Sequence, residues 1–331
     1  MDEELGGSKI TLILSGAGVG LAYGLAIRFG SLFVRNDSVL GVMTLGFMFF
    51  LPLAMGFIAV FIVERRQEQR LWVWFLLPWI PVVAGEAATV LAYLEGFICV
   101  VMFTPIALAT SSLGGIAAGL IARHSAHRAG KATMACVMLL PLVVTPLERQ
   151  FPSHRELRTV ESVTEIRATP EVVWRNIERV PRIDAAELQP SWSRRIGFPS
   201  PVEATLSHEG IGGVRHASFE RGVLFVETID TWEPEHRLGF SIHAETAQIP
   251  STTLDEHVTV GGDYFDVLRG EYRLEPLADG RIRLHLLSQH RVSTDFNWYA
   301  HLWSDAVMAD LQKTILRVVR NRCEASPGTV R

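Results

Sequence analysis

The hydrophobic and polar positions of this 331-residue chain follow two patterns, which change near residue 150. Before that point long runs contain no charged residue, and after it short stretches alternate between apolar and polar positions. A bilayer-spanning helix needs about 20 apolar residues, whereas a period of two is typical of a strand with one buried face. We therefore expect an α-helical membrane region followed by an α+β domain.

Five uncharged runs make up the first region, residues 1–150. The transmembrane spans predicted from them cover residues 10–34, 38–63, 71–93, 96–122 and 132–147. The last run is short and contains Pro141 and Pro146. The first follows Asp2, Glu3 and Glu4, the opposite of the basic flank of a secretory signal. We interpret it as a retained first helix in a bundle of about five.

Glycines recur at four-residue spacing in the first predicted helix. Gly16, Gly20 and Gly24 share one helix face, and such a groove lets a neighbouring helix approach closely. The same stretch superficially resembles a dinucleotide-binding fingerprint, but no strand precedes it. We predict a packing surface, and a candidate contact between two copies of the chain in a homo-oligomer.

Charge in the short loops predicts the orientation. Residues 64–70 and 123–131 are rich in arginine and lysine and lie two crossings apart, so they share a side of the membrane. The positive-inside bias assigns that side to the cytoplasm. Five crossings then place the N-terminus inside and residues 151–331 outside. We expect an integral protein of the plasma (inner) membrane.

Glu86 is the acidic residue that lies well inside a predicted span. An intramembrane carboxylate is costly and marks either a proton relay or a polar contact between helices. A small shift of the span would instead place Glu86 near the membrane interface. No ladder of further charges accompanies it, so a transport pathway is not predicted.

Residues 151–158 are interpreted as a linker, 159–325 as one domain and 326–331 as a tail. Alternation predicts strands at 159–166, 214–220, 223–232, 238–244, 256–260, 264–275 and 281–292. Thr169-Pro170 is typical of a helix start, and Asp279-Gly280 of a hairpin turn. Helical periodicity runs from about 298 to 322. This order predicts a curved antiparallel sheet wrapped on a long C-terminal helix, with a cavity between them.

Three segments of this domain resemble the START-like, helix-grip superfamily, also called SRPBCC. They are VTEIRATPEVVW at 163–174, the glycine-rich turn GIGGVR at 210–215 and the hairpin FERGVLFVE at 219–227. The most similar branch is the polyketide cyclase/dehydrase and lipid-transport group. The resemblance covers residues 158–324, and it implies a helix-grip fold whose members bind lipids, sterols, polyketides or nothing identified.

One candidate pair of polar residues lies in the predicted hairpin. If Arg221-Gly222 forms a two-residue turn, His216 opposes Glu227 on the next strand. The carboxylate would then raise the pKa of the histidine and orient its ring. Two placements remain open, because the pair faces either the cavity or solvent.

The last predicted strand supplies a second set of candidates. Apolar residues mark its inner face, and continued alternation places Ser288 and His290 on that face. Tyr272 on the neighbouring strand faces the same space. Trp303, in the aromatic run that begins the last helix, either forms a cavity mouth or packs helix on sheet. A lone buried histidine is also compatible with a purely structural role.

Composition and charge exclude other classes. Only 19 charged residues lie in 1–150, against 47 in 151–331, so the mean hydropathy of +0.23 averages two regimes. A net charge of −4 gives no reason to expect nucleic acid. Three scattered cysteines predict no disulfide framework, and no histidine or cysteine spacing predicts a metal site. No cofactor is predicted, and no catalytic residue is assigned.

The sequence therefore favours a membrane-anchored SRPBCC-type protein that binds a lipid or another small apolar ligand in its cavity. Two alternatives remain at this point. One is a polyketide cyclase- or dehydratase-like enzyme that uses His290, or His216 with Glu227, as acid and base. The other is a ligand-free membrane interaction or sensory module.

Overall fold

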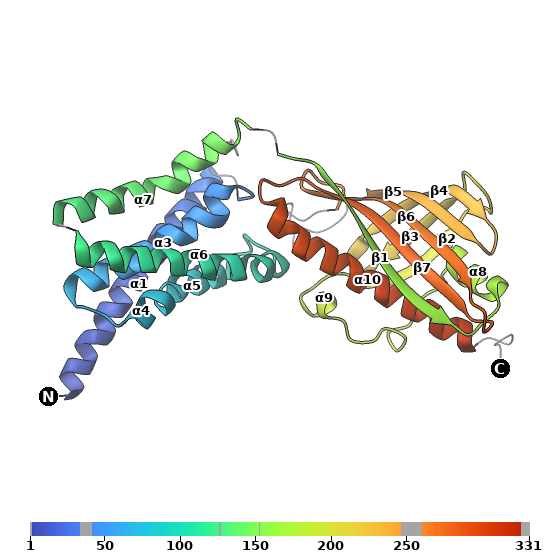
Figure 1. Ribbon diagram of the computed structural model, residues 1–331, viewed down its shortest axis with the longest axis horizontal. Coiled ribbons are helices and arrows are strands. Elements are labelled where there is room, and N and C mark those ends of the chain that lie inside the picture. The colour runs from blue at the N-terminus through green and yellow to red at the C-terminus, as the bar shows by residue number, and fades with distance from the viewer. Residues whose placement is uncertain (1, 34–41, 126, 152, 246–259, 326–331) are drawn as a thin grey trace. The chain divides into compact units, whose positions relative to one another are not determined.

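The computed structural model describes residues 2–33, 42–125, 127–151, 153–245 and 260–325. The chain divides into two compact units, Met1–Ser153 and His154–Arg331, and each is described by itself. Helices make up the first unit, and the second combines an antiparallel sheet with a long C-terminal helix (Figure 1).

The described part of the first unit contains five segments that are long and apolar enough to cross a membrane. They are Lys9–Ser31, Gly46–Arg66, Leu71–Leu91, Phe97–His124 and Ala129–Glu148. The prediction of five such helices is confirmed. The elements that carry them are α1 (Asp2–Phe33), the π-helical turn η1 (Gly46–Phe50), α3 (Leu51–Arg66), α4 (Leu71–Leu76), α5 (Trp79–Leu91), α6 (Phe97–His124) and α7 (His127–Glu148).

The glycine face of α1 packs against α3. A Cβ atom on Gly16 would lie 2.5 Å from the backbone oxygen of Ala59, and one on Gly20 would lie 2.8 Å from that of Met55. Gly24 faces the Met55 side chain in the same way. The face that we considered as a contact between two copies is therefore occupied within the chain, where small residues allow the helices to approach closely.

Ion pairs that are wholly or partly buried lie near the ends of these helices. Arg123 contacts Glu64 at 2.7 Å, and the indole Nε1 of Trp74 donates to the same carboxylate at 2.8 Å. Near the opposite ends, Arg28 contacts Glu95 at 2.9 Å. Charges taken out of water need such partners, and the buried groups of Glu64, Arg28 and Glu95 each have one.

Glu86 lies on α5, within the third apolar segment. The hydroxyl of Thr104 on α6 donates to one carboxylate oxygen at 2.9 Å. The other carboxylate oxygen is buried and has no hydrogen-bond partner. Glu86 thus forms a polar contact between α5 and α6, one of the arrangements that the sequence left open.

In the second unit a seven-stranded antiparallel sheet curls around the long helix α10 (Figure 1). The sheet order is β1-β7-β6-β5-β4-β3-β2. This is a helix-grip fold, the architecture of the superfamily that the sequence resembles, and the predicted fold class is confirmed. The strands are β1 (Glu156–Ile166), β2 (Pro201–Leu206), β3 (Val214–Phe219), β4 (Leu224–Glu233), β5 (Arg237–Glu245), β6 (Phe265–Pro276) and β7 (Ile282–Val292).

Two details of this unit differ from the predicted elements, and one predicted strand falls almost wholly outside the described residues. Strand β1 begins at Glu156, so residues 156–158 belong to the sheet and not to a linker. Strand β2 (Pro201–Leu206) was not predicted from the sequence, because it is a short strand at the sheet edge. The strand predicted at 256–260 lies outside the described residues except for Val260, which forms an isolated bridge with Phe265.

The residues at alternate positions of β7 contribute to the core. Its residues from Ile282 to Val292 are buried at every second position and face α10 (Asn297–Ala325). The short helix α8 (Pro170–Glu178) adds Trp174 and other buried apolar side chains, beginning at Pro170 where a helix needs no N–H donor. The second short helix, α9 (Trp192–Arg195), lies in the segment between α8 and β2. One contiguous core thus joins the sheet to α8 and to the second half of α10.

Candidate functional site

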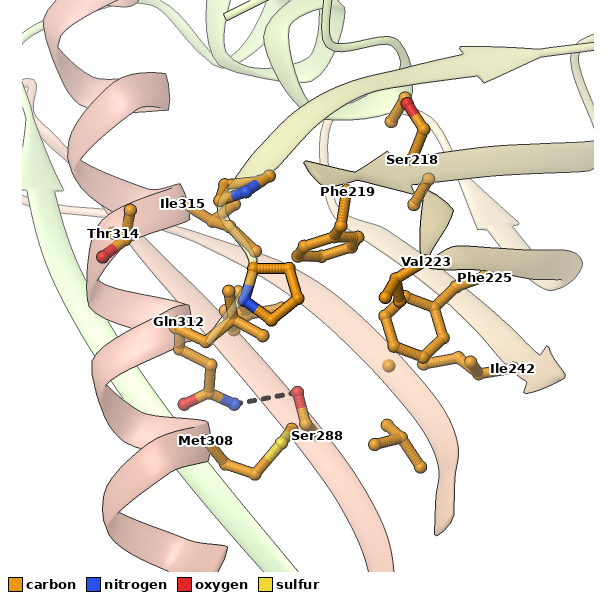
Figure 2. Close-up of a pocket in the computed structure, with 18 of the residues that line it drawn as sticks. Ser218, Phe219, Val223, Phe225, Ile242, Ser288, Met308, Gln312, Thr314 and Ile315 are labelled. Atoms are coloured by element: carbon orange, nitrogen blue, oxygen red, sulfur yellow. Dashed lines mark hydrogen bonds between the residues drawn. The ribbon is translucent and has the colours of Figure 1, made fainter. Parts of the chain in front are cut away.

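A cavity of about 160 Å³ lies between the sheet, the middle of α10 and the segment that precedes β2. Figure 2 shows Phe219 and Phe225 on one wall, facing Met308 and Gln312 of α10. The two phenylalanine rings meet edge to face, with their centroids 5.2 Å apart. Because most of the lining side chains are apolar, the cavity suits an apolar molecule.

One polar cluster stands in this apolar wall. Arg215 on β3 forms an ion pair with Glu227 on β4, and Tyr272 on β6 lies beside them. All three side chains line the cavity, and their exposed fractions are 4%, 6% and 2%. The guanidinium also lies over the ring of Phe240, 5.5 Å from its centroid. Its Nε atom is buried and has no hydrogen-bond partner.

Burial and the ion pair shift the pKa of the Glu227 carboxyl in opposite directions. Burial raises the pKa of the Glu227 carboxyl, and the adjacent Arg215 opposes that rise. Burial also raises the pKa of the Tyr272 phenol, so its hydroxyl keeps its proton at neutral pH. The cavity wall therefore holds hydrogen-bond donors on Arg215 and Tyr272.

The predicted cross-strand pair of His216 and Glu227 is wrong. The strands β3 and β4 are joined by a short 3₁₀ turn, Glu220–Gly222, in which Arg221 adopts a left-handed conformation (φ 60°). This turn pairs Arg215 with Glu227 and shifts the register by one residue from the predicted one. A shift of one residue exchanges the two faces of a strand. His216 is consequently exposed on the outer face, and Arg215 takes the inner position.

Ser288 on β7 also lines the cavity. The amide Nε2 of Gln312 donates to the Ser288 hydroxyl at 2.9 Å (Figure 2). It also donates to the backbone oxygen of Val160 at 2.9 Å. This side chain ties α10 to both β7 and β1. Its amide oxygen is buried and has no hydrogen-bond partner.

His290 lies outside the residues that line the cavity. It is fully buried, and its Nε2 atom lies 3.1 Å from the Ser304 hydroxyl and 3.3 Å from the Asp305 carboxylate. The ring of Phe265, which does line the cavity, packs 5.5 Å from the imidazole. Burial lowers the pKa of His290, although the Asp305 charge opposes that effect. The histidine joins β7 to α10.

The sequence candidates therefore fall into two groups. Tyr272, Ser288 and Glu227 line the cavity. His216, His290 and Trp303 do not, and Trp303 instead packs beside Trp192 of α9 with ring centroids 6.4 Å apart. Sequence reasoning missed Arg215 and Gln312. The signal for Arg215 was a glutamate on an otherwise apolar strand face, which needs a cationic partner on the adjacent strand.

The segment between α8 and β2 covers one side of the cavity and is fastened to α10. The carboxylate of Asp310 accepts hydrogen bonds from the hydroxyls of Ser191 and Ser193, and the second serine also donates its backbone N–H at 3.2 Å. Farther along the helix, Arg322 contacts Glu187 at 2.7 Å and holds the pKa of that carboxyl below its usual value. These contacts position the cavity wall.

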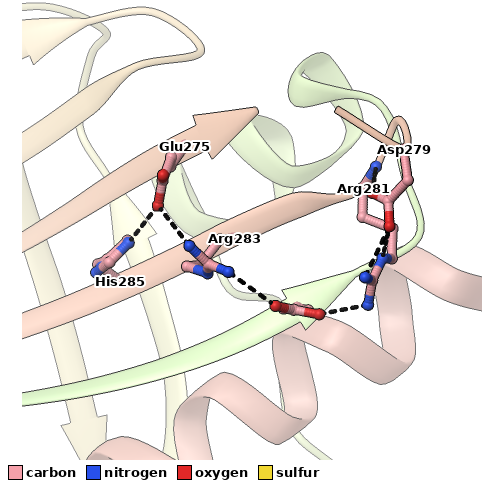
Figure 3. Close-up of polar contacts among 6 residues, drawn as sticks. Glu275, Asp279, Arg281, Arg283 and His285 are labelled. Atoms are coloured by element: carbon pink, nitrogen blue, oxygen red, sulfur yellow. Dashed lines mark hydrogen bonds and ion pairs between the residues drawn. The ribbon is translucent and has the colours of Figure 1, made fainter. Parts of the chain in front are cut away.

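The outer face of the sheet carries a network of charged side chains on β1, β6 and β7 (Figure 3). Arg283 contacts Glu165 at 3.1 Å and Glu275 at 3.2 Å. His285 contacts Glu161 at 2.6 Å and Glu275 at 3.3 Å. These groups are partly exposed and belong to the solvated face.

Comparisons with known proteins add the following. No protein-family model and no curated protein matches the chain. Similar solved structures include DynU16, a protein in the dynemicin biosynthetic locus (17% identity, TM-score 0.30, covering 52% of this chain and 49% of its own), so the chain spans about half of DynU16. A START superfamily protein from Mycobacterium smegmatis is 9% identical (TM-score 0.33, covering 50% and 97%). Norcoclaurine synthase from Thalictrum flavum is 11% identical (TM-score 0.31, covering 50% and 87%).

Proposed function

We propose that residues 154–331 bind a lipid or another small apolar molecule in the cavity between sheet and α10. The observation that supports this is the mostly apolar wall, which also holds buried polar groups, among them the Arg215–Glu227 pair. Burial of apolar ligand surface contributes about 25 cal/mol per Å² to binding. Arg215 and Tyr272 would orient a polar atom of the ligand.

We propose further that the helices of the first unit anchor this domain to a membrane. Large apolar side chains are exposed on four of the five segments, including Leu14 (58%), Trp72 (58%), Leu113 (61%) and Val143 (56%). Such surface is costly in water and favourable in lipid. Residues 46–66 form the most buried segment, as expected for the centre of a bundle.

The orientation remains the one that the loop charges favour, in the plasma (inner) membrane. The N-terminus and the basic loops lie in the cytoplasm, and the ligand-binding domain lies outside. Reporter fusions at residue 150 and at the C-terminus measure this directly. Two cytoplasmic signals would contradict the five-crossing arrangement.

Cyclase or dehydratase chemistry has less support. That alternative depends on His290, or on His216 with Glu227, acting as acid and base within reach of the substrate. Neither histidine lines the cavity. We therefore favour binding over catalysis.

Native mass spectrometry of the full chain, released from detergent in the spectrometer, tests the binding function. We expect a mass above that of the chain alone that corresponds to one retained apolar molecule. Substituting Gly270, a cavity-lining residue, with valine should remove that mass, because a Cβ atom there would already lie 2.4 Å from the Phe240 ring. Preparations that are consistently empty, together with no binding of added apolar compounds, would contradict the proposal.

A further inference from the structure

The size of the cavity limits what it can hold. At about 160 Å³ it is close to the roughly 150 Å³ cavity volume in which benzene binds. Sites for drug-sized ligands are larger, about 300–1,000 Å³. A molecule with one ring fits within this space, whereas an intact diacyl lipid would extend beyond it.

The charges around the cavity balance one another. Arg215 and Glu227 form the buried ion pair, and the other charged lining residues are Arg194 and Glu203. Among the lining residues that the structure describes, two positive and two negative groups leave no net charge to attract an ion. A charged ligand would lose its hydration without gaining an unpaired counter-charge, so the cavity favours an uncharged molecule.

One hydrogen-bond donor in the wall has no acceptor. Arg215 Nε is buried without a partner, and Glu227 occupies a different nitrogen of the same guanidinium, Nη1. A buried donor left unsatisfied is costly, and a hydrogen bond from a charged donor is among the stronger ones. A ligand oxygen satisfies it once the side chains that cover Nε move aside, because this nitrogen has almost no surface exposed to the cavity.

We propose that the ligand is an uncharged, ring-sized apolar molecule that carries a carbonyl or hydroxyl oxygen, and that this oxygen accepts a hydrogen bond from Arg215. This rests on the proposed binding function and narrows it, since it excludes intact diacyl lipids and anionic head groups. A ligand hydroxyl could also donate to the amide oxygen of Gln312 on α10, which has no hydrogen-bond partner among the described residues.

The test compares matched probes of nearly equal size on the full chain in lipid nanodiscs, by equilibrium dialysis against empty nanodiscs. Acetophenone carries the oxygen acceptor, ethylbenzene lacks it, benzoate adds a negative charge, and hexadecanol exceeds the cavity. We expect acetophenone to bind at least about tenfold more tightly than ethylbenzene, because one charged hydrogen bond separates them. Benzoate and hexadecanol should bind more weakly than acetophenone.

A double variant, Arg215→Met with Glu227→Leu, removes the donor without leaving a buried charge. Its ratio of acetophenone to ethylbenzene affinity should fall to about one. The control is Arg175→Met with Glu171→Leu, an exposed pair on α8 at 3.6 Å, which should retain the wild-type ratio.

The outcomes separate the two proposals. Equal binding of acetophenone and ethylbenzene by the wild-type chain would overturn the assignment of Arg215, while the binding function would stand. Tighter binding of benzoate than of acetophenone would overturn the inference that the ligand is uncharged. Tighter binding of hexadecanol than of acetophenone would overturn the size limit, and the binding function would stand in both cases. Absence of binding by all four probes would overturn both. The wild-type series alone decides these points if the double variant does not fold.

Discussion

The two faces of the curled sheet use the same pairing of arginine with glutamate in different surroundings. On the inner face, Arg215 and Glu227 are almost fully buried beside the cavity. On the outer face, Arg283 contacts Glu165 and Glu275 while more than a third of each side chain stays exposed. A buried pair loses hydration that its mutual attraction barely restores, whereas an exposed pair is screened and weak. Burial therefore decides which pair is costly to break.

The largest loss of stability is expected for a substitution on the inner face of the sheet. Arg215→Met leaves the Glu227 carboxylate buried without a counter-charge, and breaking such a pair costs about 3–5 kcal/mol. The double variant with Glu227→Leu should regain most of that loss. Hydrogen exchange of the β3 and β4 amides, followed by mass spectrometry, measures both. Equal losses in the single and double variants would contradict the explanation by an unpaired charge.

The loss of stability in the Arg215→Met variant should depend on pH. Burial raises the pKa of Glu227, and removal of Arg215 takes away the charge that opposes this rise. The folded-state pKa then lies above the unfolded value of about 4.3. Stability is retained below that pH and lost as the pH rises through the folded-state pKa. Exchange rates that do not change with pH, after correction for intrinsic exchange, would show that the carboxyl is not buried.

The same two faces show how far the sequence could predict the site. Alternation along β7 placed both Ser288 and His290 on the inner face, and both are buried. Only Ser288 lines the cavity, because alternation gives the face of a residue and not its position relative to the cavity. His290 lies beside Phe265 instead.

The local sequence pattern also did not determine the register of β3 against β4. A two-residue turn and the observed 3₁₀ turn suit the same Glu220–Gly222 segment, yet they place opposite faces of β3 inward. The sequence left open whether the face that carries Glu227 points to the cavity or to solvent. The residue opposite Glu227 depended on the geometry of the turn. The fold class and the five apolar helices needed no such detail, since they follow from length and periodicity.

A smaller, pH-dependent change in stability is expected where β7 contacts α10. His290 faces Ser304, Asp305 and Phe265, and Arg158 and His301 also lie near it. Burial lowers its pKa below the unfolded value of about 6.5. The contribution of His290 is thus present above about pH 6.5 and is lost as the pH falls, by at most about 1.4 kcal/mol per pH unit.

Hydrogen exchange of β7 and α10 between pH 7 and pH 5.5 measures that slope. His290→Gln, which does not titrate, should flatten it. His216→Gln, on the exposed outer face, serves as the matched control and should keep the wild-type slope. An unchanged slope in His290→Gln would assign the pH dependence to other groups.

The smallest effect is expected on the outer face, where Arg283→Met removes two contacts at once. Arg283 contacts Glu165 at 3.1 Å and Glu275 at 3.2 Å, and Arg281 and His285 remain beside those carboxylates (Figure 3). Because both glutamates keep another partner and stay in contact with water, neither becomes an unpaired buried charge. We expect exchange of the β7 amides to match the wild type, and high salt to leave that result unchanged. A loss as large as that of Arg215→Met would show that partner identity, and not burial, determines the cost of breaking a pair in this sheet.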